Sequence, residues 1–583
     1  MERKKRGYEN IMILISIIIF LFFLCFFWDF YYGVNDDIAT RNVFSGGYTG
    51  VPRPQRTSCV VTLYPIAFCI SGLYGLVSGI DFWGIFLAAS HPICFWLIAK
   101  TVLGAVKDKG NKIGVFIVTF LVFWTVDLVN LMFFQFTTVA AIYAATGIFL
   151  LFMESRSGIS YIPSICMLIM SYGIRKKITM MAFPFIGLIW IYKAYKGRHD
   201  IKRVVKQGIC YFVITGLLCG SMWVMDFCAN KESYYNKYYQ DYEALRVKAW
   251  DYHEIPDYDT NAVFYQSLGD GFSREEYGLV SQGNMAMDFS MDVKEALSYM
   301  VKYSETNKRY LGLKYKIQVA MNLFITVFNR ILIKPLVTIV GIMLILVLVY
   351  LKYARRISKL IFLLMGELGA VAEAGILLYT GRMPERIWQS LLLFAVAWMF
   401  GILIAGEHES LEEYSVSYLR IRRTIFLVAM FCLLVFCFWL IPSINKTQAR
   451  YEKTYHKSKV INEYCMGHSE NIYCCPYSFF NGDVDKLGSG SWYSDQFKNY
   501  IRIGWGAFNP AYYAMLERAG ITGTVEEAIM TQDNVLMMGT YDQNSLPLFD
   551  SYFTWKYGDD YSYKVVDVIE EYIYVWEVHL QEE

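Results

Sequence analysis

The chain has 583 residues, of which 55% are hydrophobic, 17% aromatic and only 18% charged, with a formal net charge of +2. A water-soluble protein of this length has a larger share of charged residues and a smaller share of apolar residues, so the composition excludes an ordinary soluble enzyme. Several apolar runs approach the ~20 residues that cross a bilayer, which predicts an integral membrane protein, and the near-balanced charge gives no sign of a nucleic-acid partner.

The first apolar run, 11–31, follows the basic stretch Arg3-Lys4-Lys5-Arg6 and ends in bulky aromatic residues. A signal peptide would have a shorter apolar core and a small-residue cleavage site, so this run is predicted to be an uncleaved anchor. Because basic residues favour the cytoplasmic side, we expect a cytoplasmic N-terminus and an outer loop after the anchor.

The next run, 59–80, contains Pro65 and two Ser-Gly pairs. The basic patch at 107–112 falls on the cytoplasmic side only if this run does not cross the membrane, so we expect it to lie along the outer face. The remaining runs alternate and predict a polytopic α-helical protein of the plasma membrane, with about eleven transmembrane helices and its termini on opposite faces. The expected spans are 11–31, 82–104, 113–130, 132–152, 158–174, 178–195, 207–226, 331–351, 358–379, 387–405 and 424–441.

These spans divide the chain into a membrane domain, 1–441, and an extracytoplasmic tail, 442–583. The membrane domain carries an outer loop, 32–81, and a tyrosine-rich outer insert, 227–330, whose rings fit interfacial packing better than sugar stacking. In the insert, Ser273-Arg274-Glu275-Glu276 has the pattern of a capping box, and 292–302 is predicted to be helical. The tail predicts a small α/β domain with strands at 472–480, 535–541, 561–568 and 572–580, and a helix at 510–519 that ends at Gly520.

Two adjacent carboxylates, Asp36 and Asp37, begin the first outer loop, which continues through Ser45-Gly46-Gly47-Tyr48-Thr49-Gly50. One of them could act as a general base for an acceptor hydroxyl, with the other in support. The pair could also hold Mg²⁺ or Mn²⁺ if the reaction depends on a metal, since these ions prefer oxygen ligands. The alternative is that an aspartate caps the next short helix.

Basic residues on the predicted outer side are candidates for binding a lipid phosphate. They are Arg175, Lys176 and Lys177 between two spans, Arg382 and Arg386 on a short turn, and Arg53 and Arg56 in the first loop. Simple anchoring to headgroups explains them equally well. Asp127 lies inside a predicted span, where an ionisable group is costly and usually functional, and Glu367 and Glu373 raise the same question. Pairing with outer arginines is the alternative for these acids.

The acidic first outer loop, the juxtamembrane run, the basic outer turns and the outer tail together resemble the GT-C superfamily of membrane glycosyltransferases. That resemblance implies a polyprenyl-phosphate-linked sugar donor and transfer outside the cytoplasm. It places Asp36 or Asp37 at the catalytic acid of loop one and Arg175-Lys176-Lys177 at the basic turn that meets the lipid phosphate. The loop and the turn Gly381-Arg382-Met383-Pro384-Glu385-Arg386 are also similar to a little-characterised group of bacterial polytopic membrane proteins.

The function predicted in this way is transfer of a sugar to a cell-surface glycan or lipid acceptor, as in the assembly of a cell-envelope polysaccharide. A transporter or flippase of lipid-linked saccharides would need polar groups near mid-membrane and, often, related halves. A polysaccharide polymerase or ligase would use outer arginines and a large outer loop. A non-enzymatic assembly protein would leave Asp36 and Asp37 dispensable.

Overall fold

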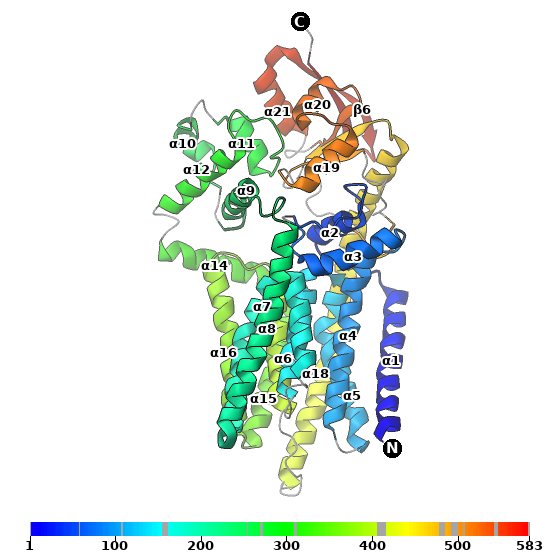
Figure 1. Ribbon diagram of the computed structural model, residues 1–583, viewed down its shortest axis with the longest axis vertical. Coiled ribbons are helices and arrows are strands. Elements are labelled where there is room, and N and C mark those ends of the chain that lie inside the picture. Colours follow the sequence, from blue (N-terminus) through cyan, green and yellow to red (C-terminus); the bar gives the residue numbers. More distant parts are fainter. Residues whose placement is uncertain are drawn as a thin grey trace. The chain divides into compact units, whose positions relative to one another are not determined.

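The computed structural model resolves the chain into two compact units (Figure 1). The helical unit comprises 1–33, 84–224 and 319–451, and the mixed unit comprises 34–83, 225–318 and 452–583. Each unit is therefore built from three separate stretches of sequence. The described residues are 2–57, 59–106, 109–153, 161–252, 255–268, 272–307, 312–404, 416–476, 484–490, 499–504, 508–541 and 546–580.

Long apolar helices make up the helical unit, and Figure 1 shows them lying side by side. Within the described residues, ten helices are long and apolar enough to cross a membrane. This agrees with the predicted polytopic helical class, because only closed hydrogen-bonding structures such as helices cross hydrocarbon. They are α1 (Glu2–Phe27), α4 (Phe82–Ala105), α5 (Lys109–Met132), α6 (Phe136–Met153), α7 (Ile162–Lys196), α8 (Ile201–Ala229), α15 (Ile333–Tyr353), α16 (Ile357–Tyr379), α17 (Glu385–Ile404) and α18 (Val416–Gly467).

Helix α7 doubles back on itself at Arg175, whose backbone leaves the helical region at φ −153° and ψ 94°. The Ser171 and Thr179 hydroxyl oxygens are 2.7 Å apart. Eight residues along a straight helix would separate them by about 12 Å. Farther along the arms, the rings of Tyr161 and Trp190 meet at 5.4 Å. The two antiparallel arms match the separate spans predicted over 158–174 and 178–195, apart from 158–160, which lie outside the described residues.

One end of the helical unit is closed by a short parallel pairing of β1 (Tyr31–Tyr32) with β2 (Phe133–Phe134). Gly33 follows β1 and donates its amide to the Phe134 carbonyl at 2.7 Å. A Cβ at Gly33 would lie 2.6 Å from the Phe133 carbonyl oxygen, so only glycine allows this approach. We call this end of the bundle the β2 end.

Helix α18 corrects one expectation from the sequence. The last helix was expected to end at Pro442, but it continues through Pro442 to Gly467, a run of 52 residues. A proline inside a helix removes a single backbone donor, and the hydrogen bonds on either side of it still hold the helix together. Residues up to Tyr451 belong to the helical unit and those from Glu452 to the mixed unit.

The mixed unit begins with α2 (Asn35–Ser45) and α3 (Tyr64–Leu76). Helix α3 is apolar but has only 13 residues, about 20 Å, which is shorter than the ~30 Å hydrocarbon layer. The insert contributes helices to this unit. Ser273 caps α11 in the predicted capping box, and Asp292 caps the second predicted helix. These helices are α9 (Lys237–Val247), α10 (Ala262–Gln266), α11 (Arg274–Ser281), α12 (Val293–Thr306) and the start of α14 (Leu313–Phe328).

The tail forms a five-stranded sheet in the order β4-β3-β5-β7-β6. Strand β3 is parallel to β4 and β5, whereas β7 is antiparallel to β5 and β6. Four of these strands fall where the sequence predicts them, although 477–480 of the first lie outside the described residues. Strand β4 has only four residues and is too short to give a periodic signal in the sequence. The strands are β3 (Ile472–Pro476), β4 (Tyr500–Ile503), β5 (Val535–Thr540), β6 (Tyr561–Ile569) and β7 (Ile573–Leu580).

Each face of this sheet has its own apolar core. One core joins Trp576 and Met537 to α19 (Pro510–Ala519), α20 (Val525–Thr531) and α21 (Leu546–Tyr557). The other joins Val575 and Met538 to the end of α18. Tyr48 of the first loop packs against both cores. The tail therefore folds around a residue of the first loop, from which it is separated by hundreds of residues in sequence.

Candidate active site

Asp36 and Asp37 lie in the first turn of α2, where the N-terminal backbone amides favour negative charge. The cap residue is Val34, so neither aspartate is the helix cap. Asp37 is fully buried at 0% exposure, whereas Asp36 is partly exposed. Of the two, Asp36 is the carboxylate that a solvent-borne hydroxyl can approach.

Arg41, one turn farther along α2, fixes this helix within the mixed unit. Its guanidinium is fully buried and lies 2.6 Å from Asp485 of the tail and 3.8 Å from Asp81. A buried charge of this kind is tolerated only with partners of opposite charge. Sequence reasoning missed all three residues as a cluster, because 444 positions separate Arg41 from Asp485.

The turn that follows α2 is also held by the tail. Arg518 of α19 donates a hydrogen bond to the Gly47 carbonyl at 3.0 Å. Gly46 ends α2 with a φ of 83°, and a Cβ there would lie 2.5 Å from the Val51 backbone. Together with Arg41, these contacts leave α2 little freedom to move relative to the tail.

Arg56 forms a second buried ion pair, with Asp226 at the end of α8. Asp226 also accepts hydrogen bonds from the Tyr235 hydroxyl at 2.8 Å and the Tyr64 amide at 2.9 Å. Burial lowers the pKa of Arg56, but Asp226 and the neighbouring Tyr234 and Tyr235 more than offset this, and the pKa is raised overall. Arg56 therefore stays charged, and the charge is already neutralised by Asp226.

Arg53, the other basic candidate in this loop, is exposed, and its amide donates to the Val43 carbonyl at 3.3 Å. It is placed beside the C-terminal part of α2, whereas Arg56 is placed against the insert.

At the β2 end of the helical unit, Arg175 occupies the tip of the α7 hairpin. It donates a hydrogen bond to the Thr137 hydroxyl, and its guanidinium lies 4.9 Å from the centre of the Phe136 ring. Cation–π contacts of this kind help to hold a guanidinium in place. Lys176 is half-buried and Lys177 is exposed on the same tip.

Arg386 reaches the same end from α17. Gln389, one turn later on α17, is hydrogen-bonded to Gln135 at 3.4 Å, and Gln135 lies two residues before the Arg175 partner Thr137. The segment 135–137 therefore lies between Arg175 and the start of α17. Among the described residues Arg386 has no ion pair, and its Nε is buried without a hydrogen-bond partner. The adjacent Glu385 is instead 2.9 Å from Arg330, and Arg382 lies half-buried on the preceding turn.

Asp127 of α5 is paired with a histidine that sequence reasoning missed. His91 Nδ1 of α4 lies 2.6 Å from the Asp127 carboxylate, and the two side chains are 0% and 1% exposed. Asn130 adds a hydrogen bond at 3.2 Å. The pairing with an arginine that the sequence suggested for Asp127 is thus not the one observed. A histidine within a predicted span was the available signal, since ionisable groups are rare there.

Glu367 and Glu373 lie on α16, and each has one carboxylate oxygen that is buried and has no hydrogen-bond partner among the described residues. Neither forms an ion pair within the part of the chain that the structure describes.

The sequence allowed for a metal at Asp36 and Asp37. Across the described ranges, no group of three or more His, Cys, Asp or Glu side chains is placed to hold a metal ion. The two aspartates also differ in burial, since Asp37 is fully buried and Asp36 is partly exposed.

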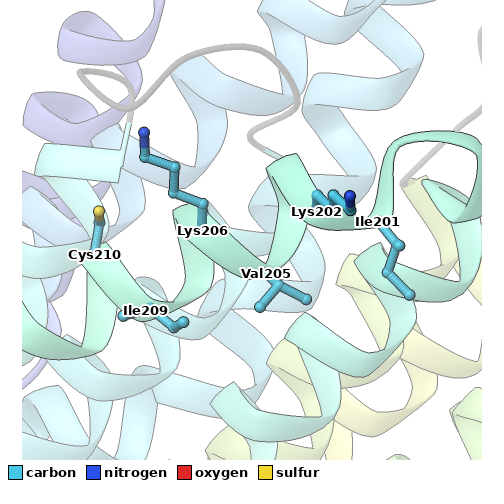
Figure 2. Close-up of a pocket in the computed structure, with 6 residues that line it drawn as sticks. All are labelled: Ile201, Lys202, Val205, Lys206, Ile209 and Cys210. Atoms are coloured by element: carbon cyan, nitrogen blue, oxygen red, sulfur yellow. The ribbon is translucent and has the colours of Figure 1, made fainter.

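At the opposite end of the helical unit from Arg175, the start of α8 presents a basic and apolar face around a shallow pocket of about 450 Å³ (Figure 2). Lys202 and Lys206 are exposed there one turn apart, above Ile201, Val205 and Ile209. This arrangement is typical of a helix entering the headgroup region of a bilayer, where lysine ammonium groups stay in water.

No family model and no curated protein matches the chain. Two solved structures are similar to it, both crystal structures of ArnT from Cupriavidus metallidurans, one in the apo state and one bound to undecaprenyl phosphate. Each is 9% identical, and each match covers 97% of this chain and 97% of that one, with TM-scores of 0.41 and 0.40.

Proposed function

We propose that this protein is a membrane glycosyltransferase that moves a sugar from a polyprenyl-phosphate-linked donor to a cell-surface glycan or lipid acceptor on the outer face of the membrane. The assignment of the class rests on the sequence resemblance to the GT-C superfamily, and the roles below rest on geometry.

The observation that carries the proposal is the gathering of Arg175 and Arg386 on either side of 135–137 at the β2 end. A lipid phosphate is an anion at the level where a membrane helix bundle ends, and guanidinium groups bind phosphate through paired, charge-assisted hydrogen bonds. The same cations stabilise the lipid phosphate as it leaves the anomeric carbon. Lys176, Lys177 and Arg382 add positive charge at the same hairpin tip and turn.

Asp36 is the proposed general base. The oxygen of an acceptor hydroxyl attacks the anomeric carbon, its proton passes to the Asp36 carboxylate, and the bond from carbon to the phosphate oxygen breaks. Asp36 lies in the first turn of α2 and is partly exposed, so an acceptor hydroxyl can reach its carboxylate. Asp37 supports α2 from its buried position, and Arg41 holds the helix against Asp485.

A second candidate is a transporter or flippase of lipid-linked saccharides. Glu367 and Glu373 favour it, since carboxylates with unpartnered oxygens on a membrane helix are a recurring feature of ion-coupled transport. In that case both glutamates would be required and Asp36 would be dispensable.

The test compares Asp36→Asn with Glu367→Gln in cells that lack the native copy, with surface-glycan composition as the readout. For a general base we expect Asp36→Asn to reduce transfer by about 10²–10⁴-fold while the protein accumulates normally. Asp559→Asn, which changes an exposed aspartate of the tail, is the matched control. A wild-type glycan from Asp36→Asn together with its loss from Glu367→Gln would reject the transferase in favour of the transporter.

A further inference from the structure

The tail sheet carries four tyrosines on one face, two on the edge strand β6, one on its neighbour β7 and one just after the end of β5. Tyr561 and Tyr563 lie two residues apart on β6 and therefore on the same face of the strand. Tyr574 of β7 lies opposite Gly539 of β5, and Tyr541 follows Gly539 by two residues. We call Tyr541, Tyr561, Tyr563 and Tyr574 the tyrosine shelf.

The face can be identified from the core beneath it. Tyr563 is paired with Val578, and Tyr561 and Tyr574 pack against the core that contains Val578 and Trp576. This is the face covered by α19, α20 and α21. Two rings of the shelf, Tyr561 and Tyr574, therefore pack against this core, and the other two are exposed.

The rings form two pairs. Tyr561 and Tyr563 are stacked, with centroids 6.1 Å apart and planes at 24°. Tyr541 and Tyr574 are 5.6 Å apart. The outer member of each pair is exposed, Tyr541 at 66% and Tyr563 at 39%. Tyrosine rings that pack against neighbours and remain partly exposed offer a flat, rigid contact area at little cost in side-chain entropy.

A carboxylate accompanies the rings. Asp550 of α21 is half-buried beside β6, and it follows burial as a cause of the raised pKa of both Tyr561 and Tyr563. The shelf thus combines aromatic faces with a hydrogen-bond acceptor and four hydroxyl groups.

We propose that the tyrosine shelf and Asp550 bind a saccharide chain. The C–H faces of pyranose rings stack on tyrosine rings, and a carboxylate accepts hydrogen bonds from sugar hydroxyls. Lys564 alternates with Tyr563 on β6 and therefore projects to the opposite face of the sheet. Strand β6 thus contributes no cation to the shelf that could bind the phosphate groups of a charged polymer. That the bound chain is the acceptor of transfer rests on the proposed function.

The test measures binding of maltohexaose, cellohexaose, chitohexaose and laminarihexaose to the full-length protein in lipid nanodiscs, by calorimetry. We expect at least one to bind, and Tyr563→Ala to weaken its binding by about tenfold. Tyr563→Phe keeps the ring and should retain most of the affinity. Tyr513→Ala, which removes an exposed tyrosine of α19, is the matched control and should bind as the wild type does.

The proposal is overturned if none of the four sugars binds, or if Tyr563→Ala binds as tightly as Tyr513→Ala. It is also overturned if the β6 edge proves to pair with a second copy of the chain, seen as a dimer that Tyr563→Ala dissociates. Asp36→Asn should bind the sugar normally. If the wild-type protein binds the sugar but the Asp36→Asn variant is fully active in transfer, Asp36 is not the general base. The proposed saccharide site would be unaffected by that result.

Discussion

Two buried arginines of the mixed unit and Arg386 of the helical unit differ in their surroundings. In the mixed unit, Arg41 and Arg56 are buried against carboxylates, Arg41 against Asp485 and Asp81 and Arg56 against Asp226. In the helical unit, Arg386 has no ion pair among the described residues, since the neighbouring Glu385 is bound to Arg330. The sequence predicted both Arg56 and Arg386 as lipid-phosphate residues and did not distinguish them.

This difference in ion pairing indicates which basic residues are available to an anionic ligand. An arginine neutralised by a buried carboxylate stabilises the fold, and removing either partner leaves an uncompensated charge. An arginine without such a partner keeps its charge for a phosphate. Of the predicted lipid-phosphate residues, Arg56 falls in the first group and Arg386 in the second.

The largest effect is expected from Arg41→Met. This change leaves Asp81 and Asp485 buried without their cation, and breaking a buried pair costs about 3–5 kcal/mol. Hydrogen exchange of the amides of α2 and of 484–490 should show faster opening of both segments. The double variant Arg41→Met, Asp485→Leu should recover part of the loss. Unchanged protection of α2 in the single variant would mean that Arg41 does not hold the helix.

A double-mutant cycle of Arg56→Met and Asp226→Asn addresses the second pair. Because the two side chains are in direct contact and buried, we expect a coupling free energy of about 2 kcal/mol, measured as shifts in the unfolding transition. A coupling near zero would place Arg56 with Arg386, among the arginines available to a ligand.

Arg386→Gln should separate binding from stability. We expect undecaprenyl phosphate in nanodiscs to bind about tenfold more weakly, which corresponds to about 1.4 kcal/mol, with no fall in the unfolding temperature. Arg330→Gln, which removes an arginine paired with Glu385, is the control and should bind as the wild type does. Equal weakening by both variants would contradict a specific role for Arg386.

The smallest effect is expected from Arg518→Gln. This arginine donates to a neutral backbone carbonyl at Gly47 rather than to a carboxylate, so its loss should cost only about 1 kcal/mol. The readout is hydrogen exchange in the turn at 46–50. If Arg518→Gln costs as much free energy as Arg41→Met, the charge of the hydrogen-bond partner does not determine the size of the loss.

Local patterns were sufficient for much of the fold. The capping box at Ser273 and the helix end at Gly520 were predicted correctly because each depends on residues within one turn. The prediction that the last helix ends at Pro442 was wrong because it relied on a local signal, and the helix continues through this proline. Strand β4 was missed because four residues are too few to show alternation.

The candidate site depends on long-range contacts. The sequence singled out Asp36 and Asp37 together, but only the structure distinguishes them, because burial of Asp37 is set by elements far away in the chain. His91 was missed because its partner Asp127 lies on another helix.

A polytopic helical membrane protein with a mixed tail could be predicted from the sequence, since hydropathy over ~20 residues and alternation over strands are local properties. Which charges are neutralised depends on the three-dimensional fold. The Arg41 and Asp485 side chains are adjacent in space and 444 residues apart in sequence, so no window of sequence contains both. Pairing and burial are properties of the folded chain, and they separate the arginines of the fold from those left for a ligand.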